Sequence, residues 1–428
     1  MKKEKIINFI DLLISNNIIS DRISKENYQL IKKIIGTNEL FQIKDFKYIV
    51  KKSSDIITKM YTNFNLYNES NFKKINITPT NYQQIRKDLH YYPSYDENKA
   101  LEIINISKKI NNRFDYELHI DTIKINLFFY CENEDINLFN NLAHIIFLFV
   151  KTFGINKDKF NNYNIRFLLI DFPRELKSDN FKENSERGFF NNSSGVHIMS
   201  KKELVVSRKN GITGLLIHEL IHMLGLDFCY NFKDNTQVNI NNWNNKWIEN
   251  NNVIKENNNI ISFIESICNT NSSYFLALFN SIFICNKLNQ PNNLIKYFKY
   301  FYYIEYLYCF VNGSKLLSFF GFNNYDSFFN NITNRKFYQN ALVFEYIIIR
   351  IFMIFDFYQL VMKYFLKCDF NKETSDSYNK NYQTELNNKL INMVEKKYIK
   401  NIFDNISKIV IIDKPKSIEY FSLDLILN

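Results

Sequence analysis

The fold of this chain is decided by the stretch ITGLLIHELIHML, residues 212–224. Its apolar composition predicts a buried helix over 213–225, with Thr213 as the N-cap and Gly225 as the C-terminal stop. His218 and His222 are four residues apart, so on a helix both imidazoles lie on one face and can share a metal ion. Polar side chains in a buried helix are costly without partners, and a metal would satisfy both histidines. The stretch therefore predicts a zinc site.

Glu219 follows the first histidine directly, where its carboxylate can take a proton from water held by the metal. Zinc lowers the pKa of such a water toward neutrality, so hydroxide becomes available at physiological pH. Histidine is rare in this chain, with six in 428 residues, which makes a chance match to the pattern uncommon. We therefore expect Zn²⁺ as the cofactor and Glu219 as the general base of a peptidase.

The segments around this helix predict an α+β fold. Residues rich in β-formers predict strands at 118–130, 165–172, 195–199 and 203–208, and apolar spacing predicts a helix over 137–153. We expect a helical N-terminal domain over 1–115, an upper subdomain with the motif helix over 116–257, and a helical lower subdomain over 258–428. The lower subdomain is expected to break near Pro291, at Gly313 and across 369–380, and 231–258 is expected to be a polar loop.

A catalytic zinc needs a third protein ligand. The metzincin pattern HExxHxxGxxH would place it at Phe228, which cannot bind metal, and Asp227 is one residue early but remains an alternative. Glu265 is the better candidate, because the segment 260–288 is strongly apolar and a carboxylate within it needs a partner. Cys268 in the same segment is a further alternative.

The order of these elements resembles the N-terminal subdomain of the zincin metallopeptidases, over about residues 116–285. A glutamate on a downstream helix, here Glu265, resembles the gluzincin arrangement, in which it is the third zinc ligand. Those families have an aspartate four residues later, and Asn269 in its place implies a hydrogen bond to a zinc-binding histidine without a negative charge. The resemblance also implies a zincin-like core with an antiparallel edge strand that binds substrate as an added strand.

The remaining histidines have two expected roles. His197 falls on the presumed edge strand, where an active-site role is open. His144 falls in an apolar helix and is expected to be a satisfied core histidine.

The residues 192–196 and 218–227 also resemble metallopeptidases of large cytoplasmic DNA viruses, including insect viruses. That resemblance implies an intracellular protein, in the host cytoplasm or packaged in the virion, and not a secreted one. The six cysteines form no CxxC pair, so free thiols in a reducing compartment are expected. No cysteine precedes Cys131 in this sequence, so we expect no propeptide thiol that blocks the metal.

The net charge of +10 comes mainly from lysines spread along the chain, so we expect no nucleic-acid partner. The apolar segment 341–358 carries Glu345, Arg350 and Asp356, so we expect no membrane span. The expected partner is a protein or peptide substrate. Two alternatives stay open: a non-catalytic structural or virion-assembly protein on a zincin scaffold with zinc retained for folding, and a basic binding module for nucleic acid or membrane.

Overall fold

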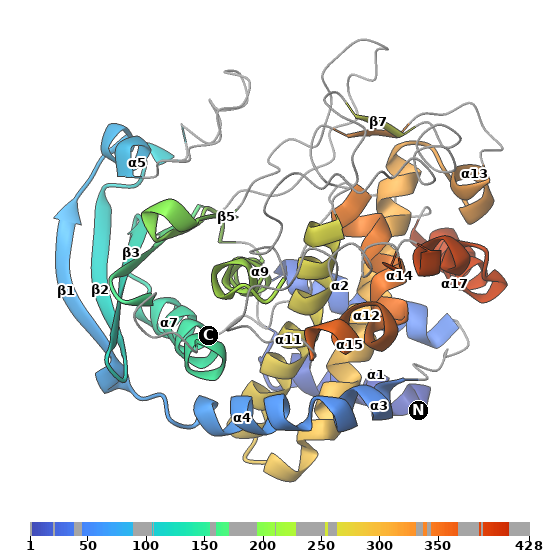
Figure 1. Ribbon diagram of the computed structural model, residues 1–428, viewed down its shortest axis with the longest axis horizontal. Coiled ribbons are helices and arrows are strands. Elements are labelled where there is room, and N and C mark those ends of the chain that lie inside the picture. The colour runs from blue at the N-terminus through green and yellow to red at the C-terminus, as the bar shows by residue number, and fades with distance from the viewer. Residues whose placement is uncertain are drawn as a thin grey trace. The chain divides into compact units, whose positions relative to one another are not determined.

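The structure of the protein is a computed structural model, and Figure 1 labels its helices and strands. It divides into two compact units: a sheet unit, with the described residues of 52–170 and 195–226, and a helical unit, with those of 2–51 and 227–410. The region predicted as an N-terminal domain, 1–115, contributes to both units. The structure describes residues 2–19, 22–37, 45–88, 105, 107–154, 160–170, 195–209, 211–227, 253–255, 263–330, 337–339, 344–366, 385–386 and 388–410.

The sheet unit is built on a six-stranded mixed sheet with the strand order β1-β2-β3-β4-β6-β5. β1, β2 and β3 pair antiparallel, β4 and β6 continue the sheet in parallel with β3, and β5 pairs antiparallel with β6. The α+β class is therefore confirmed, and β5 has the antiparallel direction expected for an edge strand. The strands are β1 (Phe72–Pro79), β2 (Asn112–Ile120), β3 (Ile123–Cys131), β4 (Tyr163–Leu168), β5 (Gly195–Ile198) and β6 (Glu203–Val206).

The prediction of one strand over 118–130 is wrong, because the chain reverses inside it. Ile120 of β2 pairs with Ile123 of β3, which leaves a two-residue turn between them. Asp121 takes a positive φ of 54° in this turn, a conformation that aspartate tolerates better than most residues. The other predicted strands exist, but β4 ends at Leu168 rather than at 172, and β5 and β6 are each shorter than predicted.

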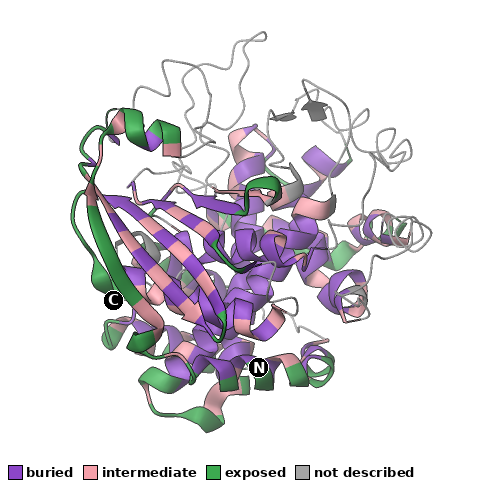
Figure 2. Cartoon of the chain, turned by 60° about the vertical axis from the view of Figure 1, so that its left-hand side comes forward, coloured by how far each residue is buried: buried purple, intermediate pink, exposed green. Residues whose placement is uncertain are grey.

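Strand β1 was not predicted, since the region 1–115 was expected to be helical. It pairs along β2, and Ile75 and Ile77 on it are 51% and 45% exposed. An exposed strand lacks the alternation of buried and polar residues that marks β2, where every second side chain from Phe114 onward is buried (Figure 2). The burial pattern therefore explains why one strand could be predicted and the other could not.

Helix α7 (Ile136–Phe153) covers one face of the sheet, as predicted for 137–153. Asp135 caps it by accepting a hydrogen bond from the backbone N–H of Leu138 at 3.1 Å. Phe139 of α7 stacks on Phe129 of β3 with ring centroids 4.0 Å apart. Among the described helices, α7 alone is long and apolar enough to cross a membrane, and the sequence alone did not single it out. Inside the protein 61% of this helix is buried, as in a core helix.

The remaining helices divide between the two units. The sheet unit also contains α4 (Ser54–Phe64), η1 (Glu69–Asn71), α5 (Tyr82–Asp88), η2 (Met199–Lys201) and α9 (Ile212–Leu224). The helical unit contains α1 (Lys3–Ser15), α2 (Arg22–Thr37), α3 (Phe46–Lys52), α11 (Phe263–Lys287), η5 (Pro291–Asn293), α12 (Leu294–Phe319), α13 (Tyr325–Phe329), η6 (Phe344–Ile349), α14 (Arg350–Phe355), η7 (Tyr358–Met362), α15 (Lys363–Phe365) and α17 (Lys397–Val410), with a two-stranded parallel sheet of β7 (Val253–Lys255) and β8 (Phe337–Gln339).

The predicted break near Pro291 is confirmed, but the break at Gly313 is wrong. Helix α12 runs through Gly313 without interruption. A Cβ on this glycine would lie 2.3 Å from Cδ1 of Ile351, so the missing side chain lets two helices approach closely. The predicted loop 231–258 contains strand β7, and the rest of it lies outside the described residues, as does the predicted break at 369–380.

His144 is confirmed as a satisfied core histidine. Its Nε2 donates to the carbonyl oxygen of Phe64 at 3.0 Å, and its ring stacks on Tyr67 with centroids 4.3 Å apart. Burial lowers the pKa of His144 from 6.5 to about 4, and the hydrogen bond opposes this only in part. His144 therefore joins α7 to α4 as a neutral side chain.

This environment predicts that the free energy of unfolding falls as the pH drops from about 6.5 to about 4. In that window the unfolded chain binds a proton at His144 and the folded chain does not, which costs about 2 kcal/mol between pH 7 and pH 5. Denaturant titrations at the two pH values should show this loss. His144→Gln keeps an N–H donor but cannot titrate, so it should lose less stability over the same interval; an equal loss would contradict the prediction.

Candidate metal centre

Helix α9 carries the metal motif, and both of its ends are set by glycine. Gly211 is the N-cap residue with a φ of 68°, and Thr213 lies inside the first turn, so the prediction of Thr213 as N-cap is wrong. Gly225, with a φ of 71°, ends the helix as predicted. The N–H of Gly225 bonds to the carbonyl of His222 at 3.1 Å, and that of Leu226 bonds to the carbonyl of Ile221 at 2.9 Å, as in a Schellman-type C-cap.

Helix α9 lies in the interior of the sheet unit, where it packs on α7, β5 and β6. All of its residues are buried except His222, which is half-buried. His218 is 3% exposed and Glu219 is 5% exposed. His218 and Glu219 are therefore removed from water, and His222 is partly so. Electrostatic interactions are stronger in such an environment than in solution.

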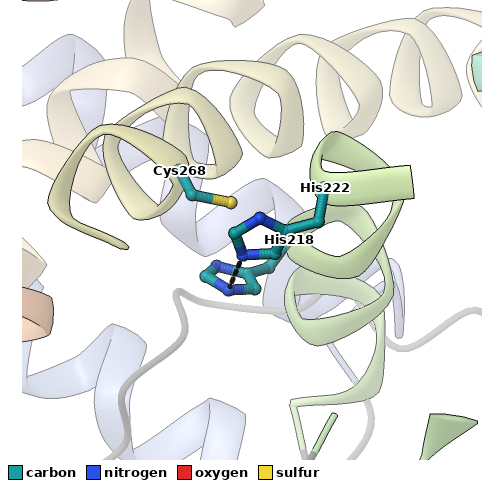
Figure 3. Close-up of side chains that lie close together, drawn as sticks. All are labelled: His218, His222 and Cys268. Carbon is teal, nitrogen blue, oxygen red and sulfur yellow. Dashed lines mark hydrogen bonds between the residues drawn. The ribbon is translucent and has the colours of Figure 1, made fainter. Parts of the chain in front are cut away.

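The two histidines converge as the sequence predicts. Their Nε2 atoms lie 3.1 Å apart, and the ring planes are inclined by 76° (Figure 3). Two ring nitrogens that bind one tetrahedral zinc, each about 2.0–2.1 Å from the ion, would lie about 3.3 Å apart. The observed separation fits a shared ion, with each imidazole neutral and offering the Nε2 lone pair.

Glu219 lies against the backbone of the edge strand. An ideal Cβ on Gly195, the first residue of β5, would lie 2.4 Å from Oε1 of Glu219 and 2.7 Å from its Cδ. The strand that is expected to bind substrate is therefore in direct contact with the residue expected to act as base. No sequence pattern indicated this contact, because it joins residues 24 positions apart.

The candidates for a third ligand lie on α11, in the helical unit. Glu265 is in the first turn of α11, where the helix dipole favours a carboxylate in any case. Its Oε2 atom is buried, and Asn269, one turn later, is 1% exposed. Their predicted roles as zinc ligand and as hydrogen-bond partner of a zinc-binding histidine remain predictions.

Among the described residues, one group of His, Cys, Asp or Glu side chains could hold a metal ion: His218, His222 and Cys268 (Figure 3). Imidazole and thiolate bind zinc and several other transition metals, so the group is not specific to zinc. Glu265 is outside it. Cys268 belongs to the helical unit, whereas α9 and β5 belong to the sheet unit.

Two further candidates from the sequence have defined surroundings. Asp227, in the turn after α9, is fully buried and is not part of the group above. His197 of β5 is half-buried, and its Nε2 lies 2.5 Å from the hydroxyl of Tyr163 at the start of β4. Burial raises the pKa of Tyr163, so this hydroxyl stays protonated. His197 therefore contacts a neutral tyrosine across the sheet.

The prediction of reduced cysteines is confirmed for the four that the structure describes, none of which is in a disulfide: Cys131, Cys268, Cys285 and Cys309. Burial raises the pKa of Cys131 to about 12 and that of Cys285 to about 11. Those two thiols are therefore poor nucleophiles at neutral pH.

No protein-family model, curated protein or solved structure matches the chain. The fold is of the mixed α+β class, which does not by itself define a function.

Proposed function

We propose that the chain is a zinc-dependent peptidase that hydrolyses peptide bonds on a zincin-like core. The observation that carries the proposal is the pair of Nε2 atoms of His218 and His222, 3.1 Å apart, with Glu219 next to them on a buried helix. A metal ion held between the two Nε2 atoms would use the lone pairs of both imidazoles, and the carboxylate beside them is placed to accept a proton. The antiparallel edge strand β5 in contact with Glu219 supports the same proposal.

The residues of the site have separate tasks in this proposal. His218 and His222 hold the ion through Nε2, so both must be neutral for binding. When bound, zinc lowers the pKa of a water molecule toward neutrality and polarises a carbonyl group. Glu219 accepts the proton released from the attacking water and then delivers it to the nitrogen of the leaving amine. Its burial excludes bulk water from this proton transfer.

Strand β5 gives the substrate a place to bind in this proposal. It pairs with β6 and ends the strand order of the described sheet. An extended peptide can add to such an edge through main-chain hydrogen bonds, whatever its side chains. Because Gly195 at the start of β5 contacts Glu219, a peptide added along β5 would pass close to the proposed base.

Replacing the third ligand directly tests the predicted set of zinc ligands, His218, His222 and Glu265. Glu265→Ala is expected to lose zinc, because a site with only two histidines has too few protein ligands to retain it through dialysis. Cys268→Ser and Asp227→Asn are expected to keep it. The zinc content per chain, measured by mass spectrometry of the metal after dialysis, distinguishes the three candidate ligands. Zinc retained in Glu265→Ala but lost in Cys268→Ser would move the third ligand to Cys268.

The alternative is a non-catalytic protein that binds zinc for folding, and a chain with zinc but no peptidase activity would favour it. If the wild-type chain binds zinc but cleaves nothing in a broad peptide library, the ion serves folding rather than catalysis. If the chain binds no zinc, both proposals fail.

A further inference from the structure

We propose that Gly195 is a positioning residue for Glu219: the absence of a side chain at this position lets the carboxylate lie against strand β5, where it can act as a base. This inference rests on the proposed role of Glu219. The residues His218 to His222 form the HELIH motif. The proposal adds a residue outside this motif that the base requires, namely a glycine on the edge strand, 24 residues before Glu219.

The contact of Gly195 with Glu219 involves several atoms of the glutamate side chain. An ideal Cβ on Gly195 would lie 2.4 Å from Oε1, 2.7 Å from Cδ and 2.7 Å from Cγ of Glu219. Real Cβ atoms essentially never approach other atoms within 3.0 Å. An alanine at this position would therefore force the carboxylate and the adjoining methylene to move together.

The backbone at Gly195 does not itself require glycine. The described glycines with positive φ are Gly211, Gly225 and Gly321, and Gly195 is not among them. Gly195 pairs with Val206 in the regular antiparallel register of β5 and β6. Alanine is compatible with such a backbone, so the space taken by Glu219 is what demands glycine here.

Neither partner can move aside without consequence. Glu219 is 5% exposed and lies on a helix whose residues are buried along nearly its whole length. Strand β5 is held by its hydrogen-bonded register with β6. The larger expected response is a rotation of the Glu219 side chain away from β5. A displacement of about 1 Å in a catalytic group can lower the rate about 10²-fold.

A double-mutant cycle on stability tests the contact without any assay of activity. Gly195→Ala in the full chain is expected to lower the Tm by roughly 2–6 °C, through overpacking against Glu219. In the background of Glu219→Ala, which removes Cγ, Cδ and both oxygens, the same substitution is expected to leave the Tm unchanged or raise it slightly. Equal effects of Gly195→Ala in both backgrounds would overturn the proposal. A single variant that does not fold beside a double variant that does would support it.

The second arm measures the positioning of the base. Gly195→Ala is expected to keep the zinc content of the wild type and its KM, and to lower kcat about 10²-fold. Gly36→Ala is the matched control, because a Cβ there meets nothing within 4 Å, and it should leave zinc, KM and kcat unchanged. An unchanged kcat in Gly195→Ala would overturn the positioning role. A wild-type chain without peptidase activity would end the proposed function, while the stability cycle would still report on the contact.

Discussion

Glu219→Gln is expected to keep the zinc content of the wild type and to lower kcat/KM for peptide cleavage about 10²–10⁴-fold. Glutamine has the same shape as glutamate, so it fills the space against Gly195 without the steric conflict that a larger change would create. Its amide cannot accept a proton at neutral pH. The two histidines that hold the metal are unchanged. The variant therefore separates proton transfer from metal binding.

The measurement combines zinc analysis with cleavage of a peptide library. Glu117→Gln on β2 is a suitable control, because Glu117 pairs with Lys124 at 2.9 Å and belongs to a part of the sheet unit with no proposed role in catalysis. It should cleave at the wild-type rate. Wild-type activity in Glu219→Gln would show that another group takes the proton, and loss of zinc in this variant would show that Glu219 supports the metal instead.

The parts of the fold that the sequence predicted are those defined by local signals. Helix α7 has a capping Asp135, apolar spacing and a terminal glycine, and it spans almost the predicted residues. The HELIH spacing fixes the relation of His218 to His222 through helix geometry alone. Both features depend on residues within a few positions of one another, so one sequence suffices to predict them.

The features that the sequence did not predict depend on contacts between distant residues or on backbone conformation. The turn at Asp121 was hidden because apolar residues continue on both sides of it. The cap at Gly211 was missed because a threonine two residues later has the side chain of a usual N-cap, whereas the helix begins at a left-handed glycine. Gly313 was interpreted as a helix break because the sequence does not show that Ile351 occupies the space beside it.

The same distinction between local signals and distant contacts applies to the candidate site. Its α9 half follows from spacing, and the structure places both histidines as predicted. The third ligand would come from outside α9, and the apolar segment 260–288, with one glutamate and two cysteines, does not define which residue that is. The Gly195 contact could have been found only from a pattern of glycine before the motif across several sequences.

His218→Ala and His222→Ala are each expected to reduce the bound zinc from about one ion per chain to nearly none, and to abolish peptide cleavage. Each variant removes one of the two imidazoles whose Nε2 atoms lie 3.1 Å apart, and a single histidine leaves the ion too few protein ligands. Dialysis followed by metal analysis measures the first effect, and the peptide library measures the second. His119→Ala is the matched control, because His119 is a surface histidine, 44% exposed, that lies 3.3 Å from Glu117; this variant should keep both zinc and activity.

Metal removal adds a readout that needs no substrate. A chelator is expected to lower the Tm of the wild-type chain, because an ion that binds only the folded state stabilises it by an amount that grows with the logarithm of the free ion concentration. The same treatment should leave the Tm of His218→Ala unchanged, since that variant has no ion to lose. His218 is 3% exposed, so its replacement by alanine also changes packing, and the comparison is therefore made within each variant before and after chelation. A chelator effect of equal size in both proteins would place the stabilising metal at a site other than His218 and His222.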